Sequence, residues 1–342
     1  MARPFGILTT DLHLTENPND DYRFGIFKWI LENHVGGRCC LFITGDLTDK
    51  KDNHSGWFVN KIVTWLKILS EHLDIYLLKG NHDFTDPNSP FFQFLGKMEC
   101  IHYFTTPLKI FPTYNDRQYR LVMLPNTRNP LKTWKGLELV KSDAIFMHQT
   151  FKGALAESGI ALDGPSSKPF EKYKAKIFSG DIHVPQQIGP VVYTGAPFHV
   201  HFGDKFEPRV LLLDENFNYK AVQYPAPRKY MADIRSPSEL KSMEKLRKGD
   251  WIKVRVQLPR SEFVDWPKHR DSTKVMCERL GLRVFGVKLQ ELRRSHLPRT
   301  ETKGETTSVS TKKPKEVFLE YCRVRGIDQH TSEIGLELLK GS

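Results

Sequence analysis

The chain has 342 residues, of which 39% are hydrophobic and 11% aromatic, enough for one large domain and a smaller one. No apolar stretch approaches the roughly 20 residues that a membrane span needs, and the N-terminal segment reaches a charge too early for a signal peptide. The five cysteines are odd in number and contain no C-x-x-C pair. We therefore expect a cytoplasmic protein with reduced thiols and no membrane association.

Positive charge is concentrated in one part of the chain. Residues 1–224 carry 25 Lys and Arg against 24 Asp and Glu, whereas residues 225–299 carry 19 against 9. A basic segment joined to a near-neutral body indicates contact with an extended polyanion, and we favour DNA over a surface that only confers solubility. Trp251 and Trp266 are expected in the core. The candidate phosphate contacts are Arg228, Lys229, Lys253, Arg255, Arg293 and Arg294.

Short apolar runs alternate with amphipathic stretches through residues 1–224. Two stretches, Tyr22–Asn33 and Ser55–His72, have helical spacing. This alternation predicts an α/β layered fold whose ligand site lies at the carboxyl ends of the strands. The runs that fit strands are Phe5–Thr9, Cys39–Thr44, Ile75–Leu78, Leu121–Leu124, Ala144–Met147, Ile177–Ser179, Val210–Asp214 and Lys220–Gln223.

A second, smaller domain is predicted after the segment Y-P-A-P-R, which is typical of a domain exit. Residues 225–294 read as an α+β domain. Residues 295–314 are polar and predict a flexible linker, and residues 315–342 have two short apolar faces at helical spacing. The elements expected in the small domain are helices at Pro237–Lys248 and Asp271–Leu280 and strands at Trp251–Gln257 and Arg283–Lys288.

The carboxyl ends of five predicted strands carry residues of the kinds that bind metal ions. Residues i and i+2 of an extended chain point to the same side, so a D-x-H pair can hold one ion. Carboxylate, amide and imidazole ligands without cysteine suit Mn²⁺ or Mg²⁺ better than a structural zinc. Five such motifs in order are hard to explain as independent turn residues. The motif residues are Asp11 and His13 in D-L-H, Asp46 and Asp49 in G-D-L-T-D, Asn81, His82 and Asp83 in G-N-H-D, His148, and Asp181 and His183 in G-D-I-H.

These motifs together resemble the motif series of the calcineurin-like metallophosphoesterases, over about Phe5–Asp204. Within that superfamily the chain looks most like the SbcD-type nucleases, bacterial and phage relatives of the eukaryotic meiotic recombination eleven nuclease. The segments D-L-H-L, P-Q-Q-I-G-P-V-V-Y-T-G-A-P and F-G-D support this narrower likeness. The resemblance implies a layered β-sandwich flanked by helices over residues 1–224, a small α+β capping domain and a helical C-terminal tail.

The resemblance also implies a role for each motif residue. One ion would be held by Asp11, His13 and His183 and the other by Asn81 and His148, with Asp46 bridging the two. His82 would face the phosphate and protonate the leaving oxygen or stabilise developing charge. Asp83 would orient the His82 imidazole, and Asp49 would lie outside the ligand shell.

The last motif departs from the family pattern, which usually reads G-H-x-H. Asp181 stands where the first histidine belongs. A carboxylate can bind Mn²⁺ or Mg²⁺, so we expect Asp181 to be a ligand and to favour the harder ion. His199 and His201, in A-P-F-H-V-H-F, are alternative ligands but are more typical of a strand surface.

The leading hypothesis is a manganese-dependent DNA nuclease, exonuclease or endonuclease, acting in DNA recombination, repair or degradation. The resemblance implies an SbcC-type ATPase partner that binds residues 315–342, and a homodimer formed through Ser55–His72. One alternative is a phosphoesterase for a small substrate such as a cyclic nucleotide or a phosphoprotein, against which the basic domain argues. A metal-free scaffold is the other, and the retained ligands and His82 argue against it.

Overall fold

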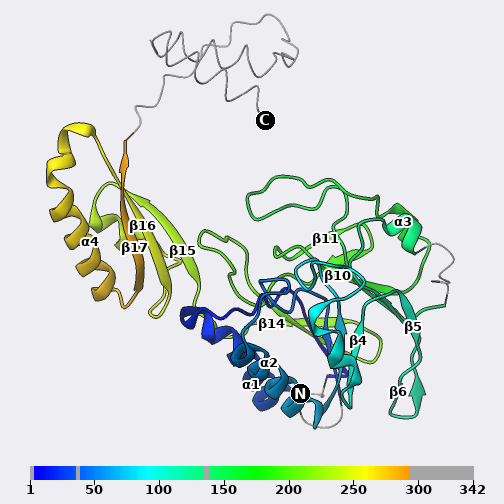
Figure 1. Ribbon diagram of the computed structural model, residues 1–342. Helices are drawn as coiled ribbons and strands as arrows, with labels where there is room; N and C mark the ends of the chain where they lie inside the picture. The colour runs from blue at the N-terminus through cyan, green and yellow to red at the C-terminus, as the bar shows by residue number, and fades with distance from the viewer. Residues whose placement is uncertain (1–3, 36–38, 135–138, 140, 293–342) are drawn as a thin grey trace, which may run out of the picture. The chain divides into compact units, whose positions relative to one another are not determined.

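The computed structural model describes residues 4–35, 39–134, 139 and 141–292 (Figure 1). The predicted linker at 295–314, the predicted tail at 315–342 and the candidates Arg293 and Arg294 lie outside these residues. In the part of the chain that is described, no helix combines the length and apolar character that crossing a membrane requires.

The first sheet contains six strands in the order β14-β13-β1-β2-β3-β4. Strands β1 to β4 are parallel, and β13 and β14 are antiparallel additions beside β1. Every residue of β1 and β2 is buried, which explains why the sequence shows continuous apolar runs there and no polar alternation. The bounds are β1 Gly6–Thr9, β2 Cys39–Ile43, β3 Leu73–Leu78, β4 Ile101–Phe104, β13 Val210–Leu213 and β14 Tyr219–Val222.

The second sheet has the order β11-β12-β10-β9-β8-β5 and packs on the first. Its central strands β8, β9, β10 and β12 are parallel, and the edge strands β5 and β11 are antiparallel. Phe42 of β2 stacks on Phe146 of β9 with ring centroids 4.2 Å apart, which places aromatic packing between the sheets. The predicted layered α/β architecture is confirmed. The bounds are β5 Leu108–Ile110, β8 Leu121–Leu124, β9 Ala144–His148, β10 Lys176–Gly180, β11 Gln186–Ile188 and β12 Val191–Tyr193.

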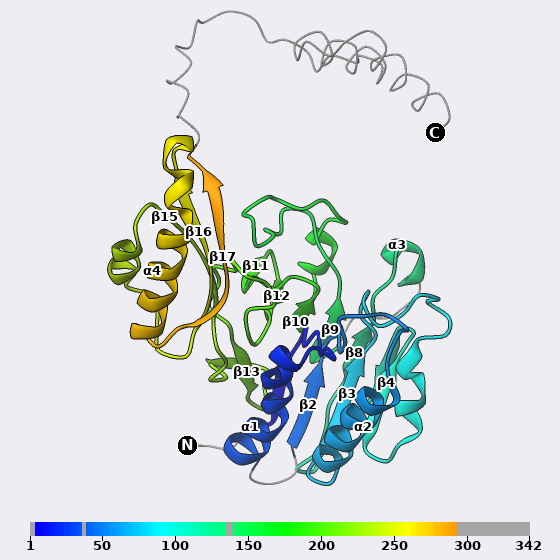
Figure 2. The ribbon, with the colours of Figure 1, turned by 60° about the vertical axis from the view of Figure 1, so that its left-hand side comes forward.

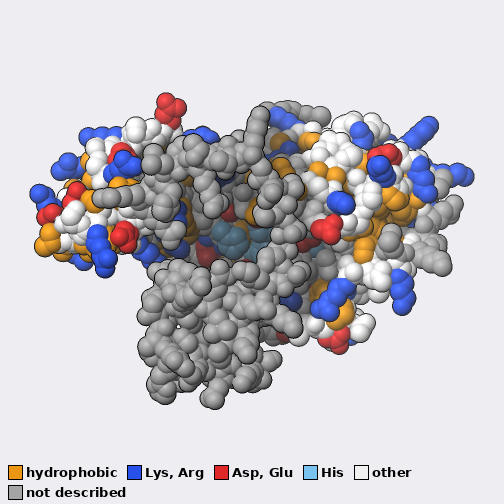
Figure 3. Space-filling model, turned by 90° about the horizontal axis from the view of Figure 1, so that it is seen from above, with side chains coloured by type: hydrophobic (Ala, Val, Ile, Leu, Met, Phe, Trp, Pro, Cys, Tyr) orange, Lys and Arg blue, Asp and Glu red, His pale blue; other side chains and the backbone are white. Residues whose placement is uncertain are grey.

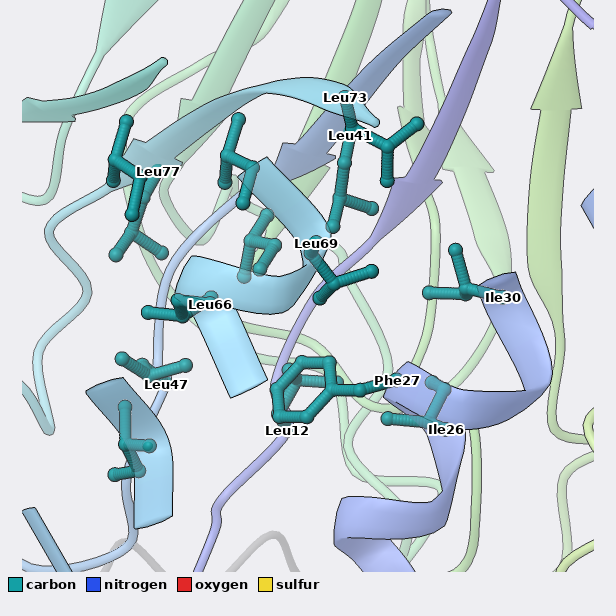
Figure 4. Close-up of a cluster of buried hydrophobic side chains, with 14 of the residues drawn as sticks. Leu12, Ile26, Phe27, Ile30, Leu41, Leu47, Leu66, Leu69, Leu73 and Leu77 are labelled. Carbon is teal, nitrogen blue, oxygen red and sulfur yellow. The ribbon is translucent and has the colours of Figure 1, made fainter. Parts of the chain in front are cut away.

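Two helices cover the outer face of the first sheet. Figure 4 shows Leu66 and Leu69 of α2, Gly56–Ser70, and Phe27 of α1, Gly25–His34, in one buried cluster with the strand residue Leu41. α2 begins where predicted because the Ser55 side chain accepts a hydrogen bond from Phe58 N. The start of the first predicted helix is instead a 3-10 helix, Pro18–Phe24, with Pro in its first turn.

Short elements complete the body. α3, Pro130–Thr133, is a single helical turn capped by Asn129. Burial raises the pKa of the Cys39 thiol to about 11, in keeping with the predicted reduced thiols. The remaining elements here are the strands β6 Thr113–Tyr114 and β7 Arg117–Gln118 and the 3-10 helices Phe91–Lys97 and Lys168–Phe170.

A third, three-stranded parallel sheet follows the body. It consists of β15 Lys229–Ile234, β16 Trp251–Leu258 and β17 Arg283–Glu291, and α4, Trp266–Arg279, lies along one face (Figure 2). β15 was not predicted. α4 begins before the predicted residue because Pro267 fits the first helical turn.

The predicted helix Pro237–Lys248 is wrong for most of its length. The structure has only a 3-10 helix there, Pro237–Ser242. A capping box between Ser236 and Glu239 starts the helix, and the chain leaves helical geometry at Met243. The segment that follows is a series of turns up to Asp250, whose carboxylate accepts hydrogen bonds from Arg228 N and Arg247 N.

Candidate metal centre

The motif residues meet at one edge of the two main sheets. Asp11, Asp46 and Asn81 follow β1, β2 and β3, His148 ends β9, and Asp181 follows β10. All five strands are parallel to a neighbour, so their carboxyl ends reach the same edge (Figure 2). Viewed from above, histidine side chains lie together there (Figure 3).

The turns after the strands have left-handed backbone geometry. Asp11, His13, Asp46 and Asp181 have φ values of 50°, 39°, 52° and 78°. Aspartate and histidine tolerate this region better than most residues other than glycine. Asp11 and His13 therefore reach the same site through a tight turn, and the expectation that an extended D-x-H segment aligns them is wrong.

Two motif positions require glycine because a ligand side chain from another turn packs directly against the backbone there. A Cβ atom on Gly80 would lie 2.1 Å from Asp46 Oδ1, and one on Gly45 would lie 2.1 Å from His148 Nδ1. Gly45 also has φ +102°, which disfavours any side chain. The glycines thus let neighbouring turns pack directly against the ligand side chains.

The first ligand group consists of Asp11, His13 and His183, whose ligand atoms lie within 4.8 Å of one another. The Nε2 atoms of His13 and His183 are 3.0 Å apart. Asp11 is fully buried, and its Oδ2 has no hydrogen-bond partner among the described residues. A buried carboxylate oxygen and two converging imidazole nitrogens fit a divalent cation, which supplies the positive charge that they lack.

The second group surrounds the Asn81 amide. The Asn81 Oδ1 atom lies 2.8 Å from His148 Nε2, 3.3 Å from Asp46 Oδ2 and 3.2 Å from Asp181 Oδ1. These four atoms each offer a lone pair to the same point, as ligands do around a hard cation. Asp181 thus lies where a ligand of the second ion is expected.

Asp46 lies between the two groups. Its Oδ2 is 3.7 Å from His13 Nε2, and its Oδ1 is 3.5 Å from His148 Nε2. Burial opposes ionisation of Asp46, but His148 and His13 outweigh it and hold the pKa of this carboxyl below its usual value. An ionised carboxylate in this position fits a bridging ligand.

His82 lies at the edge of the centre and is held by backbone. Its Nδ1 is 2.9 Å from Asp49 O, and its ring centroid is 4.9 Å from that of His13. With a proton on Nδ1 donated to this carbonyl, Nε2 remains available for a substrate. His82 is only partly buried, which suits a residue that meets a substrate.

Asp83 does not orient His82, contrary to the prediction. Its carboxylate accepts hydrogen bonds from the backbone N–H groups of Asp46 at 3.0 Å, Leu47 at 2.9 Å and Gly80 at 2.7 Å. Asp83 therefore connects the two turns that carry Asp46 and Asn81 and fixes their positions relative to each other.

The other predicted residues are an outer partner of a ligand, a structural histidine and an exposed histidine. Asp49 Oδ1 lies 3.6 Å from His13 Nδ1, behind the nitrogen that faces the centre, as expected of an outer partner. His199 is buried, with Nε2 3.0 Å from Phe206 O and Nδ1 accepting from Lys229 N. It is a structural residue. His201 is exposed, and its ring centroid is 6.2 Å from that of His183.

The candidate phosphate contacts differ in burial and in ion pairing. Lys229 is buried, and its Nζ donates to Asp20 Oδ1 at 2.7 Å, so its assignment to DNA is wrong. Arg228 pairs with Glu207, and Arg255 pairs with Asp233. Lys253 is exposed. Trp251 is buried and Trp266 packs on the small core, as predicted.

Sequence reasoning missed two residues that contact the ligands. Glu157 Oε1 lies 2.6 Å from His183 Nδ1, and this contact lowers the Glu157 pKa to about 2. The Thr150 hydroxyl donates to Asp181 Oδ2. Neither belongs to a motif, and only the position of Thr150, two residues after His148, could have pointed to it.

Residues 7–185 match the model of the family described as calcineurin-like phosphoesterase. No curated protein matches the chain. The matched segment covers more than half of the sequence and contains every ligand candidate from Asp11 to His183. The chain therefore belongs to the calcineurin-like phosphoesterase family.

Proposed function

We propose that the protein is a manganese-dependent DNA nuclease that hydrolyses phosphodiester bonds at a two-ion centre, with Mg²⁺ as the alternative ion. The family is one of phosphoester hydrolases, and the ligand groups fit divalent cations. The observation that carries the narrower proposal is a basic sheet face that is linked to the metal centre through Phe202 and His201.

Each side chain of the centre has its own role in the proposed reaction. When bound, two divalent ions polarise the phosphoryl oxygens and neutralise the charge that develops on them. His82 presents Nε2 to the leaving oxygen while Asp49 O holds Nδ1. One ion would be held by Asp11, His13, His183 and Asp46, and the other by Asp46, Asn81, His148 and Asp181.

The basic face belongs to the sheet β15-β16-β17. Alternate residues of β16 pack on the core under α4, so Lys253 and Arg255 point to the opposite face, where Lys288 of β17 lies opposite Arg255 in the strand register. Arg255 is ion-paired with Asp233 of β15, so Lys253 and Lys288 carry the net charge of this face. Lys253 Nζ lies 4.3 Å from the Phe202 ring centroid. Phe202 follows His201, which neighbours His183. A nucleic-acid strand needs such a continuation of positive charge, whereas a small phosphoester does not.

Replacing Lys253 and Lys288 together by Glu should weaken DNA cleavage and spare a small chromogenic phosphodiester. Each lost phosphate contact is expected to reduce the slope of log affinity against log salt by about one. The measurement is DNA binding and cleavage at several salt concentrations, with Lys97→Glu/Lys174→Glu as an exposed, charge-matched control. Equal losses on DNA and the small ester would favour the small-substrate alternative.

The direct test of the function is cleavage by the purified full chain with Mn²⁺. Single-stranded DNA, double-stranded DNA, a cyclic nucleotide and a phosphopeptide are compared by kcat/KM. The nuclease proposal requires DNA to be the best substrate. A better cyclic nucleotide or phosphopeptide would replace it, and a chain that binds no metal would support the scaffold alternative.

We also propose that the chain forms a homodimer through α2 and that residues 315–342 bind an SbcC-type ATPase. The α2 side chains Trp57 and Ile68 are 59% and 37% exposed, and their spacing places them on one helical face. Trp57→Glu is expected to shift the sedimentation coefficient from dimer to monomer, because an acidic side chain cannot be buried there without a partner. The control is Trp29→Phe on α1, and a wild-type monomer would contradict the dimer.

A further inference from the structure

The loop after β9 forms a hairpin over residues 151–164. Leu162 N donates to Ala154 O at 2.7 Å and Gly153 N donates to Leu162 O at 3.0 Å, so the two arms pair. The tip turns where Gly159 N donates to Ala156 O, with Gly159 at φ +80°. Glu157 therefore sits at the tip of a defined hairpin.

Hydrogen bonds fix this hairpin to the segment that follows the last ligand motif. Leu155 and the Gln186 side chain exchange two bonds of 2.8 Å. Phe151 N donates to Tyr193 Oη at 2.7 Å, and the Phe151 side chain is fully buried. The hairpin therefore has a fixed position relative to the turn that carries Asp181 and His183.

The tip of the hairpin contacts His183. Glu157 Oε1 lies 2.6 Å from His183 Nδ1, while Nε2 on the other side of the ring lies 3.0 Å from His13 Nε2. A carboxylate this close to Nδ1 favours the tautomer that carries its proton on Nδ1, and this tautomer leaves the Nε2 lone pair for an ion.

The base of the hairpin, Thr150, contacts Asp181. The Thr150 hydroxyl donates to Asp181 Oδ2, while Oδ1 lies 3.2 Å from the Asn81 amide and 3.7 Å from His148 Nε2. The hydroxyl occupies one carboxylate oxygen and turns the other toward the centre. Asp181 would thus offer one oxygen to an ion, as a single imidazole nitrogen would.

We propose that Thr150 and Glu157 are positioning residues of the metal centre, Thr150 for Asp181 at the second ion and Glu157 for His183 at the first. The inference rests on the proposed two-ion centre. The hairpin at 151–164 and its base, Thr150, thus contribute to metal affinity. The position of Asp181 as a ligand depends on the hydroxyl group of residue 150.

The test is titration of the metal-free full chain with Mn²⁺ by calorimetry, with unbound Mn²⁺ followed by electron paramagnetic resonance. Glu157→Ala is expected to weaken one ion by about 10- to 100-fold and Thr150→Val the other, as is typical of outer partners. Glu157→Gln and Thr150→Ser retain a hydrogen-bonding atom and should recover most of the loss. Glu171→Gln, at an exposed carboxylate, should bind like the wild type.

Two further measurements separate positioning from general destabilisation. Melting temperatures in chelator should match the wild type, and only the rise on adding Mn²⁺ should shrink. In an Asp181→His background Thr150→Val should cost less than about twofold, because the oxygen that Thr150 holds is gone.

The outcomes are distinguishable. A wild-type chain that binds fewer than two ions overturns the proposed function and this inference with it. A wild-type chain that binds two ions, with unchanged affinities in Glu157→Ala and Thr150→Val, overturns this inference alone. Equal losses from Thr150→Val in the wild-type and Asp181→His backgrounds would remove the link between Thr150 and Asp181.

Discussion

Asp46→Ala is expected to remove more bound metal than any other single substitution in the chain. Asp46 reaches both ligand groups, with His13 Nε2 at 3.7 Å and His148 Nε2 at 3.5 Å. Its loss also leaves two groups of buried nitrogen and oxygen ligands without the carboxylate that they share. Affinity for both ions should fall by more than the ~10- to 100-fold typical of partners outside the ligand shell.

The measurement for Asp46→Ala is metal content by elemental analysis together with Mn²⁺ titration. Asp49→Ala is the matched control, because Asp49 belongs to the same motif but lies behind His13 and is partly exposed. We expect Asp49→Ala to keep two ions at modestly reduced affinity. If Asp46→Ala retained two ions per chain, the bridging role would be rejected.

His82→Ala is expected to lower kcat by about 10²- to 10⁴-fold and leave both ions bound, since it removes a proton donor and no ligand. The imidazole is anchored through Nδ1 to Asp49 O, which leaves Nε2 for the substrate. Metal content and kcat are measured on the same preparation. His102→Ala, on an exposed position of β4, serves as the control.

The structure also defines the rival role for His82. His13, Asp46 and His82 form one of the groups whose ligand atoms lie within 4.8 Å of one another. If His82 were a ligand, metal and activity would be lost together in His82→Ala. Retained metal with lost activity is the result that only the substrate-facing role explains.

The sequence predicted the central strands of the body well because they are buried on both faces, whereas β4, β5, β11 and β12 were not predicted. β1 and β2 appear as unbroken apolar runs, which few other elements produce. In the small sheet, β15 combines the exposed Asp233 and the buried Lys229 with apolar residues, so its sequence gives no clear pattern.

The ligand residues were predictable because each directly follows a strand, where sequence order fixes position. The contacts around them depend on folding. Asp83 adjoins His82 in sequence, yet its carboxylate points to the backbone of another turn. Lys229 looked like a surface cation, but Asp20, 209 residues away, neutralises it in the interior. Glu157 reaches His183 only because a hairpin folds back over the site.

The order in which the chain is synthesised has a consequence for β1. This strand is made first, but it pairs with β13 on one side, with Gly6 opposite Leu213. His13 likewise lacks its neighbour in the metal centre until His183, 170 residues later, has been synthesised. A nascent chain therefore leaves the ribosome with an uncovered strand edge and with the ligand residues of the metal centre not yet brought together. Products of premature termination before Val210 would keep that edge exposed and would be prone to aggregate.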